Sequence, residues 1–198
     1  MKKTLLIGLS LLMSTYTFSQ TPSSFDREEV VEVKNTKAKL YANAQTWIAK
    51  TFGDYKSVIQ FEDKEQGRLI IKGLSDLGIN SYPDFKYTIT IDVKENKYRY
   101  SINDIQMGFG NYEDKIASTY SPFEENISGL KTVKLKLDNI TALSTSNMSK
   151  KELKKHEEEV NSLKGTYGRV SFRISKVKEI LDSISNSLKT AMKSNDDF

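Results

Sequence analysis

The most regular pattern in the chain is an alternation of apolar and polar residues over positions 85–103. Every second position is apolar from residue 85 to residue 93, and the alternation resumes after a turn at Glu95 and Asn96. A period of two residues is typical of an antiparallel strand that buries one face. This segment therefore predicts a β-hairpin with one apolar face and one face in water.

The chain before this hairpin predicts three more strands and one helix. Alternation over residues 25–33 predicts a half-buried strand, and two short apolar segments at 57–62 and 68–74 predict a second hairpin across a polar loop. Between them, over residues 36–51, the apolar positions fall on one face of a helix that ends at Gly53.

The chain after the hairpin is predicted to be mainly helical. A charged surface helix over 149–163 begins with a Ser-x-x-Glu capping box, and apolar residues at steps of three and four predict a long helix over 170–191. Residues 106–130 show no clean period and suggest a long loop. Alternation over 131–140 predicts one further strand.

These elements predict an α+β domain, a mainly antiparallel sheet with helices on one face, formed by residues 25–198 as a single domain. The apolar stripe of the C-terminal helix fits either packing on its own sheet or one half of a dimer. Because the helix over 36–51 is too short to cover a sheet alone, we expect the C-terminal helix to pack on the sheet and the protein to be a monomer.

The first 19 residues are typical of a secretory signal peptide. Two lysines precede an apolar run over residues 5–13, and the small residues Thr17 and Ser19 follow. The run is shorter than the roughly 20 residues that a transmembrane helix needs. We therefore expect no transmembrane segment, cleavage after Ser19, a tether over residues 20–24 and export through the general secretory route.

Charge and cysteine content restrict the partners and the compartment. The formal net charge of +4 includes two lysines of the signal peptide, which leaves +2 for the mature chain. Such a small excess argues against nucleic acid as a partner, because nucleic-acid binding needs clustered basic residues. The chain has no cysteine. We therefore expect a periplasmic or extracellular protein that is not a lipoprotein and has no disulfide.

The side chains available for catalysis are few. The only histidine, His156, lies among lysines and glutamates and is interpreted as a solvated surface residue. With no cysteine and a single histidine, we predict no metal site, no cofactor and no catalytic residue. Carboxylate pairs for acid–base chemistry, such as Asp92 with Asp104 or Glu124 with Glu125, are present, but their spacing does not distinguish them.

The aromatic residues provide the candidate binding site. Four of them lie in the aperiodic segment: Phe109, Tyr112, Tyr120 and Phe123. We predict that they bind a ligand, because loops carry binding residues more often than sheets do. Tyr98 and Tyr100, at alternating positions of the predicted hairpin, are interpreted as core residues.

Several short sequences also resemble a known family. They are Leu40–Tyr41, Trp47–Ala49, Ser57–Gln60, Glu62–Lys64, Gly67, Lys97–Tyr100 and Ser187–Met192. In these the chain is similar to a family of secreted bacterial domains of unknown function with a fold like that of the TATA-box-binding protein (TBP-like). The resemblance implies a TBP-like fold with an insertion around residues 106–168, and it implies no substrate, cofactor or catalytic residue.

The function expected from the sequence is that of an exported, non-catalytic binding or structural module of the cell envelope. Its partner would be a peptide, a glycan or an envelope protein. The alternative is a carboxylate-based hydrolase that acts on an envelope polymer or glycan, so whether the protein is an enzyme stays open at this point.

Overall fold

The computed structural model describes residues 25–78, 85–109 and 119–194. Its elements follow the order β1 (Arg27–Glu32), α1 (Lys37–Phe52), α2 (Tyr55–Val58), β2 (Ile59–Asp63), β3 (Arg68–Ser75), β4 (Phe85–Lys94), β5 (Lys97–Phe109), β6 (Thr119–Pro122), α3 (Phe123–Thr141) and α4 (Lys150–Met192). The predicted signal peptide and tether lie outside the described residues.

The strands form one antiparallel sheet in the order β1-β5-β4-β3-β2, with β6 paired to the far end of β5. The predicted hairpin is the centre of this sheet, where Asp92 of β4 lies opposite Arg99 of β5. Its turn contains Asn96 with a φ of 60°, a left-handed conformation that suits a two-residue hairpin turn. The strands predicted over 25–33, 68–74 and 85–103 are therefore confirmed. The strand predicted over 57–62 is also present, but it begins at Ile59, because Ser57 and Val58 belong to α2.

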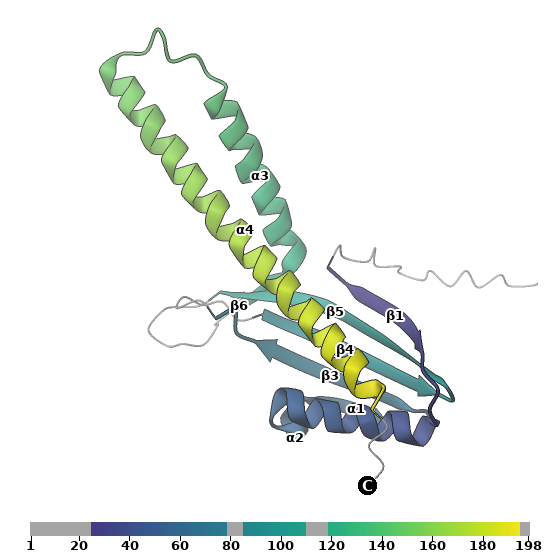
Figure 1. The fold of residues 1–198 in the computed structure, drawn as a ribbon. Helices are drawn as coiled ribbons and strands as arrows, with labels where there is room; N and C mark the ends of the chain where they lie inside the picture. Colours follow the sequence, from purple (N-terminus) through teal and green to yellow (C-terminus); the bar gives the residue numbers. More distant parts are fainter. Residues whose placement is uncertain (1–24, 79–84, 110–118, 195–198) are drawn as a thin grey trace, which may run out of the picture.

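One face of the sheet is covered by α1 and the second half of α4 (Figure 1). The alternate apolar residues of β4 and β5 are buried on this face. From α1, Leu40 and Ile48 pack into the same core, and from α4 Leu181 and Leu188 do so. The α+β architecture with helices on one face and a long C-terminal helix is therefore confirmed, and none of the helices in the described residues lies on the opposite face of the sheet (Figure 1).

The edge strand β1 is tied to α4 by two polar clusters. Arg27 donates to Asp182 at 3.0 Å, and Glu29 pairs with Lys189 and accepts a hydrogen bond from the Tyr100 hydroxyl at 3.1 Å. The hydrogen bond from Lys189 lowers the pKa of Glu29 and outweighs desolvation, which acts in the opposite direction. These contacts fix the helix across the strands.

The segment between the sheet and the last helix differs from the prediction. β5 continues to Phe109, and the predicted strand over 131–140 is wrong, because these residues belong to α3. Val133, Leu137 and Ile140 are half-buried at helical spacing, whereas Leu135 is 61% exposed. The apparent alternation arose because an exposed leucine falls between two residues of the helical stripe.

The two predicted C-terminal helices are one continuous helix of 43 residues. It passes through Gly165 and Gly168 without interruption, and its capping box of Ser149 and Glu152 is confirmed. The first part of α4 pairs with α3 to form a helical arm that projects away from the sheet (Figure 1). Val177 is the first buried residue of α4, so the arm has little core of its own.

Candidate functional site

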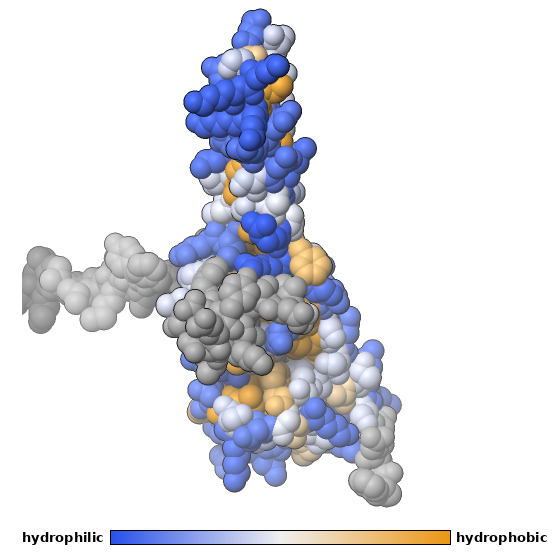
Figure 2. Space-filling model, turned by 90° about the vertical axis from the view of Figure 1, so that its left-hand side faces the viewer, coloured by the Kyte–Doolittle hydropathy of each residue, from blue (hydrophilic) through white to orange (hydrophobic). Residues whose placement is uncertain are grey.

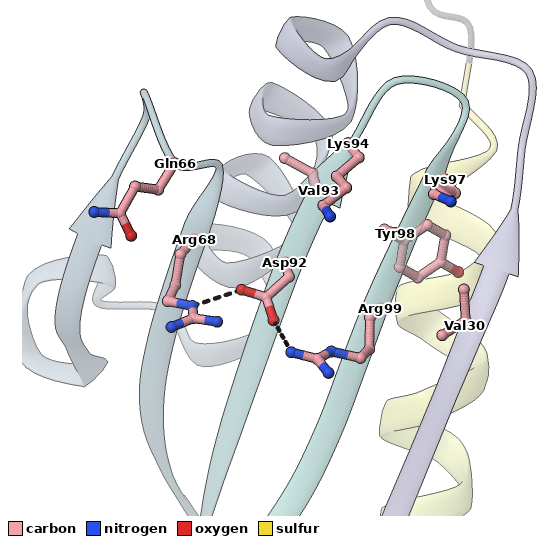
Figure 3. A pocket seen from close by; sticks show the side chains of 9 residues that line it. All are labelled: Val30, Gln66, Arg68, Asp92, Val93, Lys94, Lys97, Tyr98 and Arg99. Carbon is pink, nitrogen blue, oxygen red and sulfur yellow. Dashed lines mark hydrogen bonds and ion pairs between the residues drawn. The ribbon is translucent and has the colours of Figure 1, made fainter. Parts of the chain in front are cut away.

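The uncovered face of the sheet is polar and carries a row of charged residues across its central strands. Arg68 of β3, Asp92 of β4 and Arg99 of β5 are cross-strand neighbours in this row. Asp92 Oδ1 accepts from Arg68 Nε at 2.6 Å, and its Oδ2 accepts from Arg99 Nη2 at 2.7 Å (Figure 3). Glu28 of β1 lies 3.8 Å from the second terminal nitrogen of Arg99. One carboxylate thus holds two guanidinium groups in place.

The electrostatics of the row favour full ionisation. Burial by itself raises the pKa of Asp92, but the hydrogen bonds and charges of the two arginines outweigh that effect and hold the pKa below its ordinary value of 3.8. The contact with Asp92 raises the pKa of Arg68 in turn. Asp92 is therefore ionised at neutral pH.

A hollow of about 410 Å³ lies over this row, at the end of the sheet where β4 turns into β5. It is lined by Val30, Gln66, Arg68, Asp92, Val93, Lys94, Lys97, Tyr98 and Arg99 (Figure 3). Lys94 and Lys97 are exposed on either side of the turn. Four basic side chains thus surround one carboxylate, which gives the hollow an excess of positive charge.

The arrangement suits the binding of an anionic group. A guanidinium has five N–H donors in a planar fork that matches carboxylate and phosphate oxygens. Asp92 accepts from one nitrogen of each arginine, Arg68 Nε and Arg99 Nη2. Lysines next to the arginines add point charges that attract an anion. A volume of this size is within the range of small-ligand sites.

The hollow is not arranged for the carboxylate chemistry considered from the sequence. Asp104 lies five residues from Arg99 along β5, which at about 3.3 Å per residue places it roughly 16 Å from Asp92. Carboxylates that act together in glycoside hydrolysis lie within about 9.5 Å. Asp104, with a φ of 52° at a bulge in β5, instead accepts hydrogen bonds from Thr88 and Gln106. Asp92 and Asp104 are therefore too far apart to act as a catalytic pair.

The other candidate pair, Glu124 with Glu125, lies in the first turn of α3, and both residues are exposed. Adjacent residues on a helix do not face each other, so these two carboxylates do not converge on one substrate atom. Their position at a helix N-terminus stabilises α3 through its dipole.

The predicted aromatic site is divided between different environments. Tyr112 lies outside the described residues, and Phe109 ends β5. Tyr120 is half-buried in β6, with the Lys86 ammonium 3.4 Å from its ring centroid. Phe123 is completely buried and packs edge-to-face on Phe25 at 4.8 Å. Burial removes Phe123 from any contact with ligand in this conformation, so the placement of this residue in an exposed loop is wrong.

The residues assigned to the core from their alternation are buried. Tyr98 is 1% exposed and Tyr100 is 2% exposed. The Tyr98 hydroxyl has no hydrogen-bond partner among the described residues, and burial raises its pKa.

His156 is half-buried, and its Nε2 lies 2.9 Å from the Ile140 carbonyl oxygen. The interpretation of His156 as a solvated residue is wrong, because its side chain joins the C-terminal end of α3 to α4.

Alternation predicts Asp92 on the polar face, but the two arginines that hold it were not predicted from the sequence. One signal was present: a two-residue turn at Glu95 and Asn96 puts residues 92 and 99 opposite each other. Among the described residues no group of three histidine, aspartate or glutamate side chains is placed to hold a metal ion. In the same part of the chain, no helix is both long enough and apolar enough to cross a membrane.

Comparison with known proteins supports the fold. Residues 28–107 match the model of a domain of unknown function with TBP-like fold (DUF4468). The chain is similar to the crystal structure of a DUF4468 family protein from Bacteroides ovatus ATCC 8483, with 15% identity, a TM-score of 0.52 and coverage of 87% of this chain and 88% of that chain. It is also similar to a TBP-like protein from Parabacteroides distasonis ATCC 8503, with 16% identity, a TM-score of 0.45 and coverage of 83% and 92%.

No curated protein is significantly similar to the chain. The resemblance to domains of unknown function with a TBP-like fold is confirmed by the family match. The match ends near the start of the predicted insertion around 106–168, which stays a prediction.

Proposed function

We propose that the chain is an exported, non-catalytic module of the cell envelope that binds an anionic group in the hollow on its uncovered sheet face. The observation that carries this proposal is the excess of basic side chains around Asp92. Charged residues on a sheet surface are usually scattered with both signs. Here four basic groups converge on one concave site.

The contacts of Asp92 with the two arginines would preorganise the site for its ligand. Asp92 fixes Arg68 and Arg99, whose side chains would otherwise lose conformational freedom on binding. Their remaining donors are available for carboxylate or phosphate oxygens. Val30, which is 60% exposed, adds apolar surface beside the charges, as a peptide or a glycan would need.

The proposal is tested by thermal unfolding and calorimetry of the mature chain, residues 20–198, with citrate as a carboxylate probe and inorganic phosphate as a phosphate probe. A probe at a hundred times its dissociation constant stabilises by about 2.7 kcal/mol, a rise in Tm of roughly 5 to 11 °C. We expect the double variant K94Q/K97Q to lose this rise.

The matched control is K50Q/K56Q, which removes two exposed lysines from α1 and α2 in the helical layer. It should keep the full rise in Tm. The proposed site would be contradicted if both double variants show the same rise in Tm with a probe. It would also be contradicted if neither probe raises the Tm of the parent chain.

Export rests on the N-terminal sequence pattern. N-terminal sequencing of the protein recovered from the periplasmic and extracellular fractions is expected to begin at Gln20. A protein that stays in the cytoplasm with residues 1–19 attached would contradict the proposed location.

A further inference from the structure

A groove of about 500 Å³ lies along β3, at the end of the sheet away from the hollow. None of its lining residues belongs to the hollow, and Leu74 in its wall lies six residues from Arg68, or roughly 20 Å along the strand. Figure 2 views the molecule from the side of α2 and the end of β3, and apolar side chains gather there on the body below the arm. The groove is therefore a second surface, separate from the proposed anion site.

The edge of β3 is open in this groove. β2 pairs with β3 only between Arg68 and Ile71, and the residues before β2 form the short helix α2. β3 itself continues to Ser75, with β4 as its neighbour on one side. On the other side, no strand of the described residues pairs with Lys72–Ser75. The last part of the strand thus has a free edge.

The backbone of Leu74 points toward this free edge. Val93 of β4 donates its N–H to the carbonyl oxygen of Gly67 at 2.7 Å, so the odd-numbered residues of β4 bond toward β3. Their partners in β3 are odd-numbered as well, as Gly73 lies opposite Tyr87. Since successive residues of a strand direct their backbone groups to opposite sides, the N–H and C=O of Leu74 face away from β4. Such groups form a template for another extended chain.

The groove contacts both faces of β3, as a site along a strand edge does. Leu74 lies on the uncovered face, as Arg68 does, and is 55% exposed. Ser75 and Tyr87 lie on the helical side, where their hydroxyl oxygens are 2.9 Å apart. Gly73 permits this arrangement, because a Cβ there would lie 2.3 Å from the Tyr87 ring. An added strand would therefore have Leu74 on one side and the Tyr87 ring on the other.

The helical side of the groove is mainly apolar. Phe52 of α1 and Ile180 of α4 are half-buried and pack against the core, and Ile184 is 7% exposed. These side chains line the groove together with Val58 of α2. Alternate side chains of an added strand would enter this space, and burial of apolar side chains there would stabilise the complex.

The groove also has one charged residue in its lining, Lys72. Lys72 is exposed and has no ion-pair partner among the described residues. The acidic residues nearby are engaged elsewhere: Asp76 accepts from the Gly78 N–H at 2.8 Å, and Asp104 accepts from two polar side chains of the sheet. An opposite charge directly across an antiparallel pair is favourable, so an acidic side chain opposite Lys72 would complement the groove.

We propose that an extended peptide adds to the free edge of β3 as a further strand, with apolar residues at alternate positions and an acidic residue opposite Lys72. The outward N–H and C=O of Leu74 are the reason to choose a peptide over a small apolar molecule, because another backbone pairs with both of them. The free edge from Lys72 to Ser75 is about 13 Å long, which a peptide of about five residues covers.

The test is isothermal titration calorimetry of the mature chain, residues 20–198, with the peptide acetyl-Thr-Val-Leu-Val-Glu-amide. In an antiparallel pair its leucine lies opposite Leu74 and its glutamate opposite Lys72. N-methylation of the peptide leucine removes the N–H that faces Leu74 and should weaken binding about tenfold. N-methylation of the valine that follows this leucine is the matched control, because that N–H points away from β3, and should change the affinity less than about threefold.

The variant K72E tests the charge in the groove. It should bind the glutamate peptide about threefold more weakly and should prefer a peptide with lysine in place of the glutamate. The control K34E, in the exposed turn between β1 and α1, should keep the preference of the parent chain. K94Q/K97Q should bind the peptide as the parent does, because these two lysines line the hollow and not the groove.

Hydrogen exchange of the Leu74 amide locates the bound peptide. At ten times the dissociation constant the peptide should slow this exchange about tenfold. No binding of the peptide, equal effects of the two N-methyl groups, or unchanged exchange at Leu74 would overturn strand addition. An unchanged preference in K72E would overturn the acidic partner. Protection of Leu74 without peptide that rises with protein concentration would assign the edge to a second copy of the chain and overturn the choice of a peptide.

Discussion

Replacement of Phe123 by alanine tests whether this aromatic residue holds the fold together or binds a ligand. Phe123 begins α3, where the arm leaves the sheet, and it is completely buried. Its ring packs edge-to-face on Phe25, with 4.8 Å between centroids and an interplanar angle of 75°. The structure therefore gives it a packing role at the junction between the arm and the core.

The expected loss of stability follows from the burial of the ring. Truncation of a buried phenylalanine to alanine costs about 3 to 5 kcal/mol. The edge-to-face pair accounts for about 0.5 to 1.5 kcal/mol of this, so a double-mutant cycle with F25A should give a coupling energy in that range. For a domain of this size each kcal/mol lost in the free energy of unfolding lowers the Tm by about 2 to 4 °C. The Tm of F123A should therefore be roughly 6 to 20 °C lower.

The assay is thermal and urea unfolding of the mature chain, followed by circular dichroism, with citrate and phosphate binding measured below the Tm. We expect F123A to be destabilised and, while folded, to bind either probe as the parent does. F123L, which keeps most of the apolar volume, should recover most of the stability. If F123A loses less than about 1 kcal/mol, or loses probe affinity at full stability, the assignment of Phe123 to the core is refuted.

Two further predictions concern the charged row and the glycines. Because the pKa of Asp92 is lowered on folding, its ionised form stabilises the fold above pH 3.8, and this contribution disappears as the pH falls through the lower folded-state pKa. D92N should therefore lower the Tm at pH 7 and have less effect at pH 3. G73A should lose about 1 to 3 kcal/mol, since its Cβ would lie 2.3 Å from the Tyr87 ring. G168A should gain about 0.5 to 1 kcal/mol, because nothing lies within 4 Å of its Cβ and alanine is the better helix former.

The controls for these variants use the same surfaces. D104N, on the same sheet face but without an ion-pair partner among the described residues, should lower the Tm at pH 7 less than D92N does. A D92N variant whose loss in Tm is the same at pH 3 and pH 7 would contradict the role of the ionised carboxylate. If G73A and G168A change the free energy of unfolding in urea in the same direction, the packing argument is contradicted.

The sheet was predictable because its information is local. The alternation of β4 and β5 fixes which residues are buried, and the two-residue turn at Glu95 and Asn96 fixes their register. The contact of Arg68 with Asp92 depends on the register of β3 against β4, across the long connection between Ser75 and Phe85. No local pattern specifies that register. The sequence therefore indicates the pairing of Asp92 with Arg99 but not that of Asp92 with Arg68.

The arm was less predictable for a different reason. In the arm, α3 buries only Phe123 and α4 buries no residue before Val177. The apolar stripe there is therefore narrow, and short stretches of it imitate strand alternation, as around Leu135. Helices in most proteins are stabilised by packing of one face, and the same packing produces the periodicity that sequence analysis detects. Phe123 was misplaced because the start of α3 has no side-chain cap to mark it.

The passage of α4 through Gly165 and Gly168 has a mechanical consequence. Sharp bends in helices occur at glycine more readily than at alanine, because glycine restricts the backbone least. These two positions lie between the start of α4 and Val177, where packing on the sheet begins. A bend at these glycines would change the angle between the outer part of the arm and the sheet, while the packing of the core stays the same.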